Sequence, residues 1–153
     1  MNIIVKDVKI LRVRQETPDT KSFFLEKPDG FDFKPGQYVI LTIGKDFRAF
    51  SMASSPTEKE IMISMKMSES EFKKHIVQQK MINMKGPYGG FLMQGQKHVM
   101  LAGGIGIAPF RSMIKFVTDA NLDYEIVLLY SNKTEKDIAI KHDLDEIVSK
   151  NRR

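Results

Sequence analysis

The spacing of apolar and polar positions changes once along the chain. Up to about Lys97 the apolar residues form short runs, either alternating or continuous, which favour β-strands separated by turns rich in proline and glycine. The predicted strands are Val5–Val13, Ser22–Leu25, Tyr38–Ile43, Phe47–Met52 and Ile61–Met67. Strands this short and evenly spaced are typical of a small antiparallel barrel or sandwich. One helix is predicted among them at Glu69–Gln79, with Phe72, His75 and Ile76 on one face.

From His98 onward the pattern becomes strand, helix, strand, helix. The predicted elements are His98–Ala102, Pro109–Thr118, Tyr124–Tyr130 and Glu135–Val148. This alternation indicates βαβ units with parallel strands, so we divide the chain into residues 1–97 and 98–153. Two parallel strands leave at least one edge without a hydrogen-bonding partner. Either more polypeptide follows Arg153, or another chain or a second copy completes the sheet.

Composition narrows the chemistry. The chain has 153 residues, of which 42% are hydrophobic and 28% charged, as in ordinary globular proteins. It has no cysteine, which excludes disulfides, zinc–thiolate sites and iron–sulfur ligation within it, and three scattered histidines predict no metal site. The charged N-terminus is unlike a signal peptide, and no apolar run reaches the ~18 residues of a membrane span. We therefore expect a cytoplasmic protein.

The net charge of +5 arises from acids and bases that interleave along the sequence. No block of basic residues and no nucleic-acid-binding motif accompanies it, so no nucleic-acid partner is predicted. The excess indicates a solvated basic surface, with attraction of an anionic ligand or an acidic protein as the alternative.

Three segments carry candidate chemistry. In RAFSMASSP, Arg48–Pro56, the side chains of Arg48 and Phe50 share one side of a strand, where a guanidinium can bind phosphate and an aromatic ring can lie against a planar ligand. The alternative is an edge arginine over a core phenylalanine. The second segment, KGPYGGF at Lys85–Phe91, allows a close backbone approach to a ligand, although alone it predicts a tight turn.

The third segment, LAGGIGIAPF at Leu101–Phe110, predicts a strand, a glycine turn and a helix start. Backbone N–H groups at such a turn can bind phosphate, aided by the helix dipole. Pro109 replaces the last glycine of the dinucleotide-binding fingerprint, so the turn alone is weak support for nucleotide binding.

In this order, the segments resemble the ferredoxin–NADP reductase superfamily over essentially the whole chain. RAFSMASSP is similar to its flavin motif, GPYGGF to its G-P-x-G-x-F motif, and LAGGIGIAPFRSM and LLYSNKTEKDIAIKHDLDEI to its nicotinamide-nucleotide segments. The resemblance implies an all-β antiparallel Greek-key barrel that binds flavin, residues 1–97, followed by a partial α/β Rossmann-like NAD(P)-binding domain, residues 98–153.

The resemblance also implies roles for individual residues. Arg48 would bind a flavin phosphate, Phe50 would border the isoalloxazine ring, and Ser51, the candidate catalytic residue, would hydrogen-bond near its reactive N5 edge. The backbone of Met65, Lys66 and Met67 would contact the ring and the ribityl chain. The remaining candidates are Lys73 for a phosphate, Gly103, Gly104 and Gly106 for the pyrophosphate of NAD(P)H, and Ser131, Asn132 and Lys133 for the adenosine ribose.

The sequence departs from the family pattern at several places. Phe50 stands where the family often has tyrosine, and the segment Met67–Lys73 lacks the usual glycine turn, so the resemblance favours FAD but leaves FMN open. Ser131 to Lys133 could receive a 2′-phosphate, which favours NADPH slightly over NADH. The family's C-terminal motif near the nicotinamide is absent from these 153 residues.

The leading hypothesis is an enzyme, a flavin-dependent oxidoreductase that passes electrons between NAD(P)H and a ferredoxin-like or other redox protein. The alternative is a flavin-binding electron-transfer subunit that does not oxidise NAD(P)H alone and is completed by a partner subunit or a homodimer. A third hypothesis is a truncated form of a longer reductase.

Overall fold

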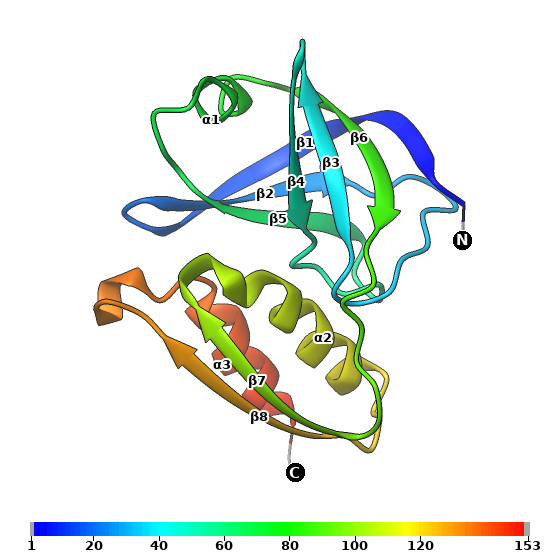
Figure 1. Ribbon diagram of the computed structural model, residues 1–153, viewed down its shortest axis with the longest axis vertical. Coiled ribbons are helices and arrows are strands. Elements are labelled where there is room, and N and C mark those ends of the chain that lie inside the picture. Colours follow the sequence, from blue (N-terminus) through cyan, green and yellow to red (C-terminus); the bar gives the residue numbers. More distant parts are fainter. Residues whose placement is uncertain (1, 152–153) are drawn as a thin grey trace.

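A curled antiparallel sheet forms the first part of the computed structural model, which describes residues 2–151 (Figure 1). Its strands are β1 (Ile4–Thr17), β2 (Thr20–Glu26), β3 (Tyr38–Ile43), β4 (Asp46–Ser51), β5 (Glu60–Lys66) and β6 (Met81–Tyr88). They lie in the order β4-β3-β6-β1-β2-β5, and a short helix, α1 (Glu71–Ile76), follows β5. An antiparallel bridge between Met52 and Ile63 brings the two outer strands together. The predicted antiparallel sheet is thus confirmed as a six-stranded half-barrel.

The second part is a small α/β region. Its elements are β7 (Lys97–Gly103), a 3₁₀ turn η1 (Gly104–Ile107), α2 (Ala108–Asp119), β8 (Glu125–Ser131), a second 3₁₀ turn η2 (Glu135–Asp137) and α3 (Lys141–Lys150). Strands β7 and β8 pair in parallel in full register, from Lys97 opposite Glu125 to Gly103 opposite Ser131. Figure 1 shows α2 between this two-stranded sheet and the half-barrel. The predicted alternation of strands and helices is confirmed.

One strand was missed at the sequence level. The tight turn predicted for Lys85–Phe91 is wrong for its first half, because Lys85–Tyr88 belongs to β6, which lies between β1 and β3. Ile82 and Met84 of β6 are buried in the core, at alternate positions as a half-buried strand requires. The glycine and proline of this segment concealed the strand, because both residues are usually depleted in strands.

Two predicted helices also differ from the structure. The first is shorter than predicted, spanning Glu71–Ile76, and His75 is exposed while Phe72 and Ile76 are buried. The helix predicted at Glu135–Val148 is split into η2 and α3 by Ile140, whose φ is +61°. Ile140 is fully buried in this conformation, which a β-branched residue rarely adopts. The break lets Ala139 and Ile140 pack between the two regions while α3 buries Ile147.

Two apolar clusters hold the molecule together. The first fills the half-barrel, with Phe23, Leu41, Ile63 and Met84 among its fully buried members. The second joins the regions: Phe24 and Met62, on the outer face of β2 and β5, pack with residues of η1, α2 and the segment before α3. The apolar runs in β2 and β5 therefore mark strands buried on both faces. None of the helices within residues 2–151 is long and apolar enough to cross a membrane.

The outer face of β7 and β8 is different, because apolar side chains on it are exposed. Val99, Leu101, Val127 and Leu129 are 49–69% exposed. Val99 lies opposite Val127 and Leu101 opposite Leu129, so the four side chains form one patch, which we call the outer β7–β8 face.

Candidate functional site

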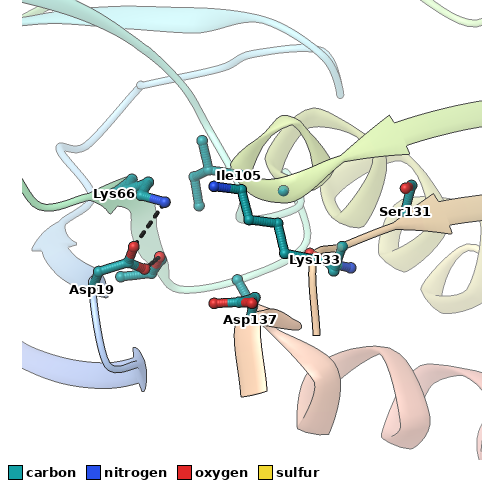
Figure 2. A pocket seen from close by; sticks show the side chains of 10 residues that line it. Asp19, Lys66, Ile105, Ser131, Lys133 and Asp137 are labelled. Carbon is teal, nitrogen blue, oxygen red and sulfur yellow. Dashed lines mark hydrogen bonds and ion pairs between the residues drawn. The ribbon is translucent and has the colours of Figure 1, made fainter. Parts of the chain in front are cut away.

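A cavity of about 300 Å³ lies where the carboxyl ends of β7 and β8 meet the half-barrel (Figure 2). Residues of both regions line it: Asp19, Thr20 and Lys66 from the half-barrel, and Gly104, Ile105, Ser131, Asn132, Lys133, Asp137 and Ala139 from the α/β region. In parallel α/β sheets, ligands bind in crevices outside the carboxyl ends of the strands. The position of the cavity is therefore that of a ligand site.

The glycine turn forms one wall of this cavity. Gly104 has a φ of +48°, and a Cβ added to Gly103, Gly104 or Gly106 would meet nothing within 4 Å, so these glycines border open space. The turn is held from the next strand, because the Tyr130 hydroxyl donates a hydrogen bond to the Gly104 carbonyl at 2.9 Å. Burial raises the pKa of the Tyr130 phenol, which keeps it protonated as the donor.

The segment after β8 forms the second wall. Thr134 and Asp137 form a reciprocal capping box in which each side chain receives a backbone N–H of the other residue, and the Thr134 hydroxyl also donates to Asp137 at 2.8 Å. This closes Ser131–Asp137 into a compact loop at the cavity. Within this loop the buried Oδ1 of Asn132 has no hydrogen-bond partner among the described residues. A buried acceptor left unpaired at a cavity indicates that a donor on a ligand or a water completes it.

The half-barrel contributes an ion pair as the facing wall. Lys66 Nζ lies 2.7 Å from Asp19 Oδ2, because the β2–β5 register sets Thr20 opposite Lys66 at the end of both strands. The hydrogen bond between these groups raises the pKa of Lys66 and lowers that of Asp19. Figure 2 shows this pair on the half-barrel side and Ser131, Lys133 and Asp137 on the α/β side.

The predicted flavin residues of β4 lie away from this cavity. The Arg48 Nη1 group donates hydrogen bonds to the side chain of Asp46 and to the Phe47 carbonyl, and the Arg48 side chain is 49% exposed. Phe50 is half-buried and its ring centroid lies 5.7 Å from that of Phe72 in α1, while the Arg48 guanidinium lies 5.9 Å from the Phe72 ring centroid. Arg48 and Phe50 thus share one face of β4, as predicted, and both contact α1.

The other predicted flavin residues lie at the ends of β4 and β5 and in α1. Ser51 is half-buried at the end of β4, opposite Tyr38. Met65 is buried in the half-barrel core, and the Met67 amide donates to the Asp19 carbonyl at 2.6 Å. Lys73 of α1 donates from Nζ to the carbonyl oxygen of Lys66, which links α1 to the strand that lines the cavity.

The structure therefore brings together Lys66, Gly104, Ser131 and Lys133 around one cavity, with Gly103 and Gly106 in the adjoining turn. It does not bring Arg48, Phe50, Ser51, Met65, Met67 or Lys73 to that cavity. Sequence reasoning missed Asp19, Tyr130 and Asp137. A Thr134-x-x-Asp137 capping signal was present in the sequence, whereas the meeting of Asp19 with Lys66 depends on strand register and had no local signal.

Comparison with known proteins agrees with the arrangement of the two regions. A family model described as "Oxidoreductase NAD-binding domain" matches residues 100–153. The chain is 35% identical over 155 residues to sulfhydrogenase 2 subunit gamma of Pyrococcus furiosus, covering 93% of this chain and 52% of that protein. It is 33% identical over 163 residues to the reductase component of propane 2-monooxygenase of Mycolicibacterium goodii, covering 95% of this chain and 45% of that protein.

Solved structures share the fold. A ferredoxin NADP+ reductase of Neisseria gonorrhoeae with bound FAD and NADP superimposes with a TM-score of 0.80 at 24% identity, covering 93% of this chain and 63% of the other. The chain spans about half the length of the curated relatives it matches, 52% and 43% for the first two. Residues 100–153 therefore match the oxidoreductase NAD-binding domain family, and the half-barrel joined to an α/β region is the fold that the chain shares with the solved ferredoxin–NADP reductase.

Proposed function

We propose that this chain forms the flavin- and nicotinamide-binding part of an oxidoreductase that passes electrons from NAD(P)H, through a bound flavin, to a redox protein. One observation carries the proposal: the end of β5, predicted to contact flavin, and the glycine turn, predicted to bind NAD(P)H, border the same cavity. Electron transfer between two cofactors requires their binding segments to lie close together. Here Lys66, at the end of β5, and Gly104, in the glycine turn, line the same cavity.

In this proposal, residues 1–97 form a Greek-key barrel for flavin and residues 98–153 a partial Rossmann-like domain for NAD(P)H. The bridge between Met52 and Ile63 supports a closing barrel, and the eight residues that connect Tyr88 of β6 to Lys97 of β7 support a boundary there. Because NAD(P)H is a cytoplasmic metabolite, we also place the protein in the cytoplasm.

The residues on β4 fit a flavin phosphate and ring. The pair between Arg48 and Asp46 is exposed and therefore weak, so a phosphate can replace Asp46 on the guanidinium at little cost. Phe50 would border the ring, and the Ser51 hydroxyl would hydrogen-bond near its reactive edge. A bound flavin supplies the chemistry that converts hydride transfer into single-electron transfer. The proposed flavin is FAD, and FMN is the alternative.

Three further contacts complete the proposed flavin site. The side chain of Met65 is buried, so Met65 would contact the ring through its backbone, as would Lys66 and Met67. Lys73 already reaches the Lys66 carbonyl and would hold a flavin phosphate by its charge.

The cavity supports the nucleotide-binding part of the proposal. Gly103, Gly104 and Gly106 leave room for a pyrophosphate against backbone N–H groups, and the unpartnered Oδ1 of Asn132 would accept a hydrogen bond from a ribose hydroxyl. Ser131 and Lys133 lie at the same cavity, where they would bind the adenosine ribose and its 2′-phosphate. This supports NADPH over NADH. The protein's contribution to the rate is then to hold the two rings within near-attack distance.

The test is an anaerobic absorbance spectrum of the purified protein before and after addition of NADPH or NADH. We expect yellow protein that bleaches on addition of either nucleotide, and flavin affinity reduced by about tenfold or more in Arg48→Ala, because charge-assisted hydrogen bonds are lost. The matched control is Arg12→Ala, since Arg12 is an equally exposed arginine of the same sheet, paired with Glu60. Protein that stays colourless after addition of FAD and FMN would refute the proposal.

The electron acceptor in this proposal is a ferredoxin-like or other redox protein. Two of the relatives are a monooxygenase reductase component and a sulfhydrogenase subunit, which supports a chain that works with further components. The net charge of +5 favours an acidic acceptor, because complementary charge accelerates encounter.

A second candidate function is a flavin-binding subunit that oxidises NAD(P)H only when a partner chain or a second copy completes its sheet. The exposed apolar side chains of the outer β7–β8 face favour it, because large apolar patches usually mark contact surfaces. Rapid bleaching of the flavin by NADPH at protein concentrations where the chain is monomeric would exclude this candidate.

A further inference from the structure

A single buried arginine, Arg111 of α2, bonds to both regions of the molecule. Its side chain is 6% exposed. Nη1 donates to the Ala53 carbonyl at 2.8 Å and to Glu58 Oε2 at 2.7 Å, and Nη2 donates to Glu58 Oε1 at 3.0 Å, so all three bonds reach the β4–β5 connection of the half-barrel. Nε donates to Asp143 Oδ2 of α3 at 2.8 Å. The guanidinium therefore joins the half-barrel to both helices of the α/β region.

The two segments that Arg111 connects lead directly to the two proposed cofactor sites. Ala53 comes two residues after Ser51, the residue proposed to lie at the reactive edge of the flavin. Helix α2, which carries Arg111, begins immediately after the glycine turn Gly104–Ile107. The neighbouring Ser112 reinforces the connection, because its buried hydroxyl donates to the Ser54 carbonyl at 2.6 Å.

The hydrogen bonds of Arg111 constrain the orientation of the two regions more tightly than apolar packing would. Apolar side chains can slide past one another, whereas a planar guanidinium fixes the angle and distance of each acceptor. Burial alone would lower the pKa of Arg111, but the carboxylates of Glu58 and Asp143 raise it above its ordinary value, so the cation persists. Removing one partner of the buried pair between Arg111 and Asp143 is costly, so the arrangement is held firmly.

We propose that Arg111 is a positioning residue that sets the distance and orientation between the flavin edge beside Ser51 and the turn at Gly104 that is proposed to bind the pyrophosphate of NADPH. It touches neither proposed cofactor site and acts through Ala53 and through α2. The inference rests on the proposed function for its catalytic consequence, whereas the positioning itself is a property of the chain alone.

The catalytic consequence is tested with the flavin-loaded chain. We compare Arg111→Lys, Glu58→Gln and the control Lys6→Met, whose lysine is exposed on β1 opposite Met84 of β6. We measure flavin content, NADPH affinity, the rate of flavin reduction at saturating NADPH, and the long-wavelength charge-transfer absorbance of the stacked rings. A displacement of ~1 Å can cost about a hundredfold in rate, so Arg111→Lys is expected to slow reduction by roughly that factor and to weaken the charge-transfer band.

Flavin content and NADPH affinity should stay within about threefold of the original protein, because the residues proposed to bind flavin all belong to the half-barrel and those proposed to bind NADPH all belong to the α/β region. Glu58→Gln should give a smaller loss of rate, since Arg111 keeps its bonds to Ala53 and Asp143. An unchanged rate and charge-transfer band in folded Arg111→Lys would overturn the proposal.

A second measurement needs no cofactor. Because the chain has no cysteine, spin labels can be attached at Lys45→Cys in the half-barrel and Ser149→Cys in α3, both exposed positions. The distribution of distances between the labels should be narrow in the labelled parent and in Lys6→Met, and broader or shifted in Arg111→Lys and Glu58→Gln. Identical distance distributions in the parent and in Arg111→Lys would overturn the positioning role, whether or not the chain binds flavin. A chain that binds no flavin would refute the proposed function but not the positioning role.

Discussion

Strands β2 and β5 of the half-barrel are buried on both faces, whereas β7 and β8 of the α/β region are buried on one. On β2, Phe23 is fully buried inside the half-barrel and Phe24 is 6% exposed against the α/β region. On β7, Met100 is 4% exposed, whereas Leu101 is 69% exposed. The apolar residues of both β2 and β7 are consecutive in the sequence. Such a run indicates a strand whose two faces are both apolar. What lies against each face is decided elsewhere in the chain.

The largest test of this comparison is Phe24→Ala. Removing a buried aromatic side chain between the regions should lower the free energy of unfolding by about 3–5 kcal/mol, measured by urea denaturation. The control is Phe47→Ala in the same sheet, where the side chain is 63% exposed, with an expected change within about 0.5 kcal/mol. Equal effects at the two positions would mean that the α/β region does not stabilise β2.

The polar part of the same interface gives a smaller and pH-dependent effect. Burial alone would raise the pKa of the Asp143 carboxyl, but Arg14 and Arg111 lower it below its ordinary value. Because the folded pKa is below the unfolded value of about 3.9, Asp143 stabilises the fold above that pH, and this stability is lost as the pH falls through the folded pKa.

We therefore expect Asp143→Asn to cost about 1–3 kcal/mol at neutral pH and to flatten the loss of stability below about pH 4. Urea unfolding between neutral and acidic pH measures both. The control is Asp145→Asn, because Asp145 is exposed and pairs with Lys141 across the surface of the helix. If Asp143→Asn lost as much stability at acidic pH as the original protein, the buried Asp143 would not be the source of that loss.

Within the α/β region, Tyr130→Phe tests whether the covered face of β8 shapes the cavity. Loss of the hydroxyl leaves the Gly104 carbonyl without this donor and should cost about 1 kcal/mol, and NADPH affinity should fall by about fivefold as the turn loosens. Equilibrium titration with NADPH gives the affinity. The control is Tyr124→Phe, just before the other end of β8, and an equal loss there would contradict the role of the Gly104 bond.

The smallest effect is expected on the uncovered face. Leu101→Ser should change the free energy of unfolding by less than about 0.5 kcal/mol in dilute solution, because the side chain is already exposed. Sedimentation at increasing concentration should show whether the apolar face causes self-association that the variant abolishes. If Leu101→Ser lowered the free energy of unfolding as much as Phe24→Ala does, the outer β7–β8 face would be covered in solution.

Much of the fold could be predicted from local pattern. The strands at Tyr38–Ile43 and Ile61–Met67, the helix after Pro109 and the parallel pair of the second region follow from apolar spacing and turn residues. Strand β6 was missed because Gly86 and Pro87 lie within it, and the break at Ile140 was missed because a left-handed isoleucine is locally unfavourable. In both cases tertiary packing outweighs local preference.

The candidate site was predictable only in part. The glycine turn and the Ser131–Lys133 segment follow strands in the sequence, and carboxyl ends of parallel neighbouring strands must meet, so their convergence could be foreseen. Lys66 was predicted to contact flavin, but its pairing with Asp19 across the cavity depends on the β2–β5 register. Arg111 gave no signal, because an arginine on a helix normally faces solvent.

By itself, the sequence determined which segments form strands and helices and which turns can admit a phosphate, because both depend on residues a few positions apart. The tertiary structure alone decided which faces are covered, how Lys66 meets Gly104, and that Arg111 is buried between Ala53, Glu58 and Asp143. Those outcomes depend on contacts between residues far apart in the chain, such as Arg111 and Ala53, which are 58 positions apart, and local sequence carries no record of such pairings.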